Sequence, residues 1–206
     1  MSRTLIKDAL GATAPRDAIF LQGWVRTRRD AKAFSFIELN DGSSLKGIQI
    51  IADATLPDYA NIAQANTGAA LEVSGRLVES KGQGQKWEVV AEKITVIGQA
   101  DATYPLQKKG HTLEFLREIA HLRPRSNLFG AVFRVRSRLA YAVHQFFQER
   151  GFHYVHTPII TASDCEGAGE LFRVSTLDPL SPPRTKEGAV DYTKDFFGKQ
   201  AYLTVS

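Results

Sequence analysis

The segment Phe34–Gly42 has the sequence FSFIELNDG, which predicts a strand followed by a tight turn. Large apolar and polar side chains alternate along its first six residues, as they do in a strand with one buried face. The last three residues favour a hairpin turn, because glycine adopts positive φ angles without steric cost. The second arm of this hairpin is predicted at residues 47–52, where isoleucines flank Gln49.

Strand-like segments fill most of the first hundred residues around this hairpin. A short amphipathic helix precedes them and ends at Gly11, and a second short helix is predicted at residues 57–66. Three strands, a helix and two strands follow one another as in an OB-fold, whereas an SH3-like barrel has no helix at that place. The predicted strands cover residues 18–26, 34–39, 47–52, 70–78 and 87–97.

The two strands of the hairpin have an aliphatic face and a mixed face. If the aliphatic face fills the core, then Phe36 and Gln49 point outward. OB-folds bind single-stranded nucleic acid by stacking bases on exposed rings, so Phe36 is a candidate for base stacking. A different register, which would bury Phe36 in the core, is the alternative. The predicted core residues are Ile37, Leu39, Ile48 and Ile50.

A long helix dominates the second half of the chain. Apolar residues recur every three or four positions over residues 127–150, Ser126 is a suitable N-cap, and Gly151 ends the pattern. About 24 residues make a helix of roughly 36 Å. Such a helix packs on more than one neighbour, either in a second subunit or within a monomer. A strand is predicted at residues 152–156, and Pro158 keeps the chain extended after it.

Residues 163–170, with the sequence SDCEGAGE, form an acidic loop that contains two glycines. Glu166 lies next to a glycine, and a carboxylate on such a mobile backbone can bind an ammonium group by a charge-assisted hydrogen bond. A solvated acidic turn is the alternative. The nearby residues Cys165, His153 and His156 match no zinc-ligand spacing, so no metal site is predicted.

The composition argues against several classes of protein. No apolar run approaches the ~20 residues of a membrane-spanning helix, and the N-terminus lacks the apolar core of a signal peptide. A single cysteine cannot form an intrachain disulfide, which favours a cytoplasmic location. The net charge of +4 weakly favours polyanionic partners. The basic residues of the chain gather between residues 101 and 138. This cluster could bind a polyanion, and a solvated face is the alternative.

Three segments of the first half resemble the anticodon-binding domain of class IIb aminoacyl-tRNA synthetases. They are GWVRTRRD at residues 23–30, FSFIELND at residues 34–41 and GIQI at residues 47–50. This subgroup comprises the aspartyl, asparaginyl and lysyl enzymes, whose anticodons share a central uridine. The resemblance implies that Phe36 stacks on this uridine. It also implies that Gln49 and an arginine at about Arg28 form hydrogen bonds with anticodon bases.

The second half resembles the beginning of the class II catalytic domain. A helix, a strand marked by proline and a carboxylate loop follow one another as in motif 1 and the amino-acid-gating loop, and the loop is similar to that of the asparaginyl members. The resemblance implies that Glu166 closes over the bound amino acid and that Ser206 begins the substrate-binding segment. It also implies a homodimer, with interface residues Arg150, Gly151 and Pro158.

The expected architecture is therefore a β-barrel followed by an α+β segment. We expect an OB-fold at residues 1–100, a hinge at residues 101–120, and the start of a class II antiparallel-sheet catalytic domain at residues 121–206. Motifs 2 and 3, which bind ATP in this family, are missing from the sequence. The chain is therefore expected to be an N-terminal portion that contains no catalytic residue.

The resemblance implies activation of asparagine with ATP and Mg²⁺ and its transfer to tRNA(Asn). A chain of this extent is expected to bind tRNA without charging it. The aspartyl enzyme is one alternative, since most groups that face the amino-acid side chain lie beyond Ser206. A non-catalytic OB-fold RNA-binding protein is the other alternative. The long helix and the acidic loop disfavour it, because a binding module does not need them.

Overall fold

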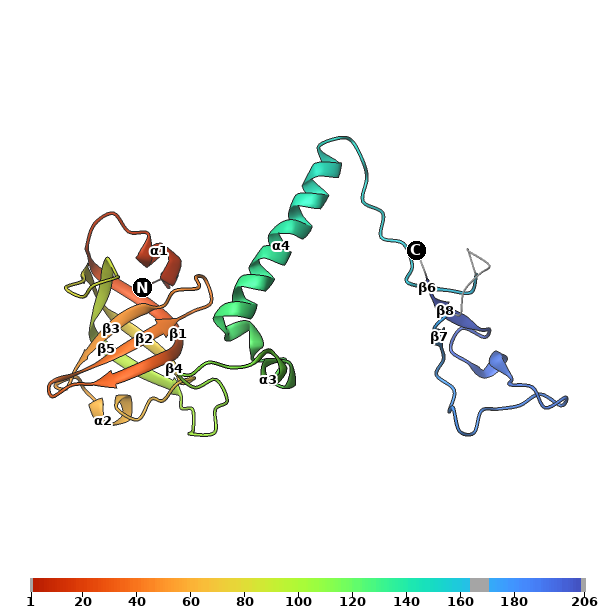
Figure 1. Ribbon diagram of the computed structural model, residues 1–206, viewed down its shortest axis with the longest axis horizontal. Helices are drawn as coiled ribbons and strands as arrows, with labels where there is room; N and C mark the ends of the chain where they lie inside the picture. Colours follow the sequence, from red (N-terminus) through yellow and green to blue (C-terminus); the bar gives the residue numbers. More distant parts are fainter. Residues whose placement is uncertain (1, 164–170, 205–206) are drawn as a thin grey trace. The chain divides into compact units, whose positions relative to one another are not determined.

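A computed structural model describes residues 2–163 and 171–204 of the chain (Figure 1). The chain forms two compact units, Met1–Tyr141 and Ala142–Ser206. The first unit contains a barrel and the first turns of a long helix, and the second contains the end of that helix and a small sheet. The predicted limits of the hinge, residues 101 and 120, stay a prediction.

The barrel is closed by five strands in the order β1-β2-β3-β5-β4. All neighbouring strands are antiparallel except β3 and β5, which pair in parallel. Helix α1 (Ile6–Leu10) precedes β1 and helix α2 (Tyr59–Ile62) lies between β3 and β4, so the predicted OB-fold is confirmed. The strands are β1 (Arg16–Asp30), β2 (Phe34–Asn40), β3 (Ile48–Asp53), β4 (Ala70–Glu79) and β5 (Trp87–Gly98).

Aliphatic side chains that alternate along the strands form the core of the barrel. Burial of each such side chain contributes about 1.5–3 kcal/mol, so the aliphatic face determines the register of the hairpin. Trp87 of β5 is also buried, and its Nε1 donates a hydrogen bond to the carbonyl oxygen of Ala12 at 2.9 Å. The four predicted core residues all have exposures of 1% or less: Ile37, Leu39, Ile48 and Ile50.

Strand β1 contains a β-bulge that changes which of its side chains face outward. The ladder with β2 pairs Val25 with Leu39 and then continues at Thr27. Arg26 is therefore an extra residue with no partner opposite it in β2. Beyond such a bulge, the alternation of side chains between the two faces is shifted by one residue.

A buried carboxylate holds the β2–β3 turn to α1. Asp41 accepts hydrogen bonds from the backbone nitrogen of Ile6 at 3.0 Å, and from the backbone nitrogen and hydroxyl of Ser43 at 2.9 and 2.6 Å. Burial raises the pKa of Asp41, but these hydrogen bonds outweigh burial and hold the pKa below its usual value. Gly42 has the expected positive φ angle, 82°, but the connection is longer than the predicted tight turn, because residues 41–47 separate β2 from β3.

Helix α3 (Leu113–Glu118) and the 3₁₀ turn η1 (Arg123–Arg125) lead to the long helix α4 (Asn127–Gln148). The hydroxyl of Ser126 accepts a hydrogen bond from the backbone nitrogen of Phe129 at 3.3 Å, which confirms the predicted N-cap. Neither α4 nor any other described helix is long and apolar enough to cross a membrane. One side of α4 exposes a row of apolar side chains: Leu128, Val132, Val135, Leu139, Val143 and Phe146.

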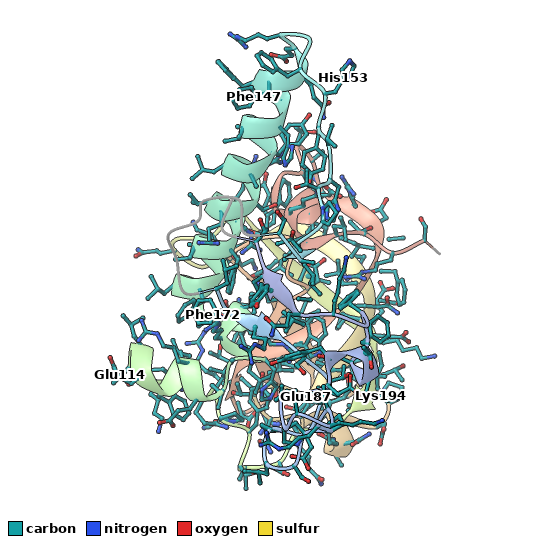
Figure 2. The ribbon with its side chains drawn as sticks, turned by 90° about the vertical axis from the view of Figure 1, so that its right-hand side faces the viewer. Glu114, Phe147, His153, Phe172, Glu187 and Lys194 are labelled. Atoms are coloured by element: carbon teal, nitrogen blue, oxygen red, sulfur yellow. The ribbon has the colours of Figure 1, made fainter. Side chains whose placement is uncertain are left out.

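The second unit contains a small antiparallel sheet in the order β6-β8-β7. Gly151 follows α4 with a φ angle of 82°, and in Figure 2 the chain turns between Phe147 and His153. The strand predicted at residues 152–156 is wrong, because a strand needs a paired neighbour and this segment has none among the described residues. The strands are β6 (Ile160–Thr161), β7 (Arg173–Val174) and β8 (Ala201–Leu203).

A long segment connects β7 and β8, and the labels of Glu187 and Lys194 locate it in Figure 2. Asp195, near the end of this segment, binds residues at its beginning. It accepts hydrogen bonds from the backbone nitrogen of Thr176 at 2.9 Å and from the hydroxyl of Ser175 at 2.7 Å. These hydrogen bonds hold the pKa of Asp195 far below its usual value. The 3₁₀ turn η2 (Tyr192–Lys194) directly precedes this carboxylate.

Candidate nucleic-acid interface

An open cavity of about 970 Å³ lies against the outer face of β1, β2 and β3. Its lining includes barrel side chains, residues of the linker at 104–111 and the start of α4. Three of the barrel residues form what we call the outer-face group: Arg29, Phe36 and Gln49. A ring, a cation and an amide on one wall suit a planar, hydrogen-bonding ligand such as a nucleobase.

Phe36 supplies the aromatic ring of the outer-face group. The ring lies 5.5 Å from that of Phe34 in a T-shaped contact, and the guanidinium carbon of Arg29 lies 5.4 Å from its centroid. The adjacent side chains of Ser35 and Ile37 are buried, so strand alternation turns Phe36 to the outside. The predicted outward direction of Phe36 is confirmed, since its side chain lines the cavity.

A buried carboxylate orients the amide of Gln49. Nε2 of Gln49 donates a hydrogen bond to Oε2 of Glu88 at 3.0 Å. The same oxygen accepts hydrogen bonds from the hydroxyl of Ser80 at 2.9 Å and from Nε2 of Gln85 at 3.1 Å. A carboxylate accepts hydrogen bonds only, so the nitrogen of the Gln49 amide faces Glu88. The carbonyl oxygen of Gln49 is then the end turned away from Glu88, where it can accept a hydrogen bond from a ligand.

Glu88 is a residue of this network that the sequence analysis missed. It is 6% exposed and stands in β5 between two buried side chains, Trp87 and Val89. A carboxylate inside an apolar strand needs hydrogen-bond partners, because burying an unpaired charge is costly. The single acidic residue in this apolar run is therefore the signal that could have revealed it.

The structure does not bring Arg28 together with Phe36 and Gln49. Nη1 of Arg28 donates to the carbonyl oxygen of Ala63, directly after α2, and Nη2 lies 3.2 Å from the carboxylate of Asp30. Carbonyl groups at the end of a helix have no partner within the helix, so a guanidinium stabilises them there. Arg28 thus fastens α2 to the barrel.

The bulge at Arg26 explains why Arg29 takes the place expected for Arg28. Residues directly opposite each other in an antiparallel ladder share a face. Arg28 lies opposite the buried Ile37, and Arg29 lies opposite Phe36. Simple alternation from the start of β1 would have turned Arg28 outward, and the extra residue reverses this.

The remaining predicted site residues belong to the second unit. Glu166 and Ser206 lie outside the described residues. The guanidinium carbon of Arg150 lies 3.7 Å from the centroid of the Phe146 ring, and its Nη1 donates to the Phe146 carbonyl oxygen at 3.0 Å. Pro158 is exposed in the segment that follows Gly151.

Two family models match the chain in succession. Residues 19–97 match the OB-fold nucleic acid binding domain, and residues 112–181 match the class II tRNA synthetases of the D, K and N group. The chain therefore combines an OB-fold with the beginning of a class II synthetase domain.

The curated relatives that match the chain are asparagine–tRNA ligases. The chain is 61% identical over 207 residues to an asparagine–tRNA ligase of Nitratidesulfovibrio vulgaris, and 58% identical over 207 residues to one of Porphyromonas gingivalis. These matches cover 100% of the chain but 45% and 44% of the relatives. The chain is thus similar along its whole length to asparagine–tRNA ligases, and it spans less than half the length of these curated relatives.

Solved structures share the fold along the whole chain. The asparaginyl-tRNA synthetase of Pyrococcus horikoshii, complexed with asparaginyl-adenylate, superposes with a TM-score of 0.78 at 21% identity, over 100% of this chain and 43% of that one. A putative aspartyl-tRNA synthetase from Leishmania major Friedlin gives a TM-score of 0.73 at 18% identity, over 100% of this chain and 38% of that one. At these identities the likeness supports the fold alone.

Proposed function

We propose that this chain is the tRNA-binding part of an asparagine–tRNA ligase, and that its barrel binds the anticodon of tRNA(Asn). The observation that carries the proposal is the outer-face group, which places Arg29, Phe36 and Gln49 on one wall of the cavity. The similarity of the whole chain to asparagine–tRNA ligases supports the proposal. In the whole enzyme, asparagine is activated with ATP and Mg²⁺ and transferred to the tRNA.

The geometry suggests how the central uridine of the anticodon is bound. Its base stacks on Phe36, and stacking of this kind contributes about 1–3 kcal/mol for each base. The carbonyl oxygen of Gln49 accepts a hydrogen bond from N3–H of uracil. Cytosine has no hydrogen on N3, so the same amide orientation discriminates against it. Arg29 provides a positive charge beside the ring for the RNA backbone.

The proposal predicts a preference for uridine. The chain should bind a tRNA(Asn) anticodon stem–loop about tenfold more tightly than one with cytidine at the central position, because the cytidine leaves the Gln49 oxygen unpaired. Fluorescence anisotropy at one fixed salt concentration measures both affinities, since RNA binding depends strongly on salt. Equal affinities for the two stem–loops would rule out the proposed recognition.

A second prediction separates the two neighbouring arginines of β1. Arg29→Gln should weaken stem–loop binding about fivefold, because it removes a cation next to the bound base, and should leave thermal unfolding unchanged. Arg28→Gln should lower the free energy of unfolding by about 1–3 kcal/mol, because it leaves the carbonyl oxygens after α2 unpaired, with little change in affinity. The reverse pattern would place Arg28 in the site after all.

The chemistry of activation is assigned to no described residue. No three His, Cys, Asp or Glu side chains of residues 2–163 and 171–204 lie together in a way that could hold a metal ion. We propose that Glu166 binds the ammonium group of asparagine in the whole enzyme. We also propose that the enzyme is a cytoplasmic homodimer, with Arg150, Gly151 and Pro158 at the interface. The exposed apolar row on α4 supports the homodimer.

A further inference from the structure

Arginine and aromatic side chains gather where the barrel meets the start of α4. Arg26, the bulge residue of β1, donates from Nη1 to the carbonyl oxygen of Arg125 and from Nη2 to Oδ1 of Asn127 at 2.7 Å. These two acceptors lie at the end of η1 and at the first residue of α4. One barrel side chain therefore holds the chain at the point where the long helix begins.

Arg125, just before α4, contacts the barrel with its own side chain. Its guanidinium carbon lies 4.3 Å from the centroid of the Trp24 ring, and its Nη1 donates to the hydroxyl of Tyr104 at 3.2 Å. Tyr104 itself lies against the barrel. A Cβ atom added to Gly68 would come within 2.8 Å of the Tyr104 ring, so the ring approaches this backbone closely. The guanidinium thus lies over the Trp24 ring and donates a hydrogen bond to Tyr104, and a flat cation with several donors suits both contacts.

A second attachment lies on the β2–β3 turn. Nη2 of Arg134 donates to the carbonyl oxygen of Gly42 at 2.5 Å. One turn earlier on α4, Gly130 is buried, and a Cβ added there would lie 3.3 Å from Cδ2 of Leu45. The turn cannot shift easily, because the buried carboxylate of Asp41 holds it to α1.

We propose that these two attachments form a fixed joint that holds the base-binding wall of the barrel at one angle to α4. A single attachment lets two bodies rotate about it, whereas two separate attachments remove that freedom. The strands that carry Phe36 and Gln49 flank the β2–β3 turn, so the joint acts directly on them. Its use in a synthetase, where it sets the angle between the bound anticodon and the first turns of α4, rests on the proposed function.

The width of a distance distribution tests the joint. Nitroxide labels on Lys32→Cys and Ser137→Cys, in a chain with Cys165→Ser, report the spacing between the barrel and α4 by pulsed electron paramagnetic resonance. The unaltered joint should give one narrow distribution. Combining Arg26→Gln, Arg125→Gln and Arg134→Gln removes the side chains of both attachments and should about double the width, because small polar interfaces leave domains free to move.

The control is Arg123→Gln. The Arg123 guanidinium lies over Phe129 and Phe133 of α4 itself, so this substitution should leave the width of the distribution unchanged. Trp24→Phe keeps an aromatic face for Arg125 and should also keep the narrow distribution. Thermal unfolding of each variant checks that the barrel stays folded. An unchanged width in the folded triple variant would overturn the joint. The labels are measured without RNA, so a failure of RNA binding would refute the proposed function and leave this result standing.

Discussion

Replacing Phe36 by alanine should weaken binding of the tRNA(Asn) anticodon stem–loop by about 1–3 kcal/mol, or roughly 5- to 150-fold, because the base loses its stacking surface. Phe36 lines the cavity from the outside of the barrel, while the core beneath it is filled by aliphatic side chains. The substitution should therefore leave the fold intact. Fluorescence anisotropy with a labelled stem–loop measures the affinity, and circular dichroism checks the fold.

The matched control is Phe34→Ala. Phe34 is an exposed phenylalanine of the same strand, two residues away, and its ring makes a T-shaped contact with the Phe36 ring. Its loss should change the affinity less than about threefold, because no base stacks on it directly. Equal losses for both variants would show that the face is merely apolar, and an unchanged affinity for Phe36→Ala would contradict stacking.

Replacing Trp87 by alanine should lower the free energy of unfolding by about 3–5 kcal/mol, the largest stability effect we expect. Trp87 is 1% exposed, so the substitution leaves a cavity in the barrel core. It also leaves the carbonyl oxygen of Ala12 without the Nε1 hydrogen bond. Urea unfolding followed by circular dichroism measures the change, which is a large fraction of the stability of a typical domain.

The chain has two tryptophans, which provides a matched control. Trp24 is 38% exposed, so Trp24→Ala should lower the free energy of unfolding by less than about 2 kcal/mol. Trp87→Phe should fall between the two alanine variants, because it keeps most of the apolar volume and loses the hydrogen bond. Similar costs for Trp87→Ala and Trp24→Ala would mean that Trp87 is not the central residue of the core.

The sequence alone was sufficient for the barrel and for the outward placement of two of the three residues predicted to contact bases, Phe36 and Gln49. Alternation in the hairpin placed Ile37 in the core and Phe36 outside it, and the order of strands and helices defined the OB-fold. These features depend on residues close in sequence, and apolar residues at every second position of a strand can be recognised in the sequence itself. Ser126, the N-cap of α4, was predicted for the same reason.

Only the tertiary structure showed which arginine accompanies Phe36. The bulge at Arg26 appears when β1 pairs with β2, and it turns Arg29 outward in place of Arg28. Glu88 was missed because the donor that links it to the outer face, Gln49, lies 39 residues away in the sequence. The predicted strand at residues 152–156 failed because it has no neighbour to pair with among the described residues. Local periodicity determines which residues can form a strand or a core. The faces of residues beyond a bulge, and the partners of a buried charge, are decided when separate segments of the chain meet.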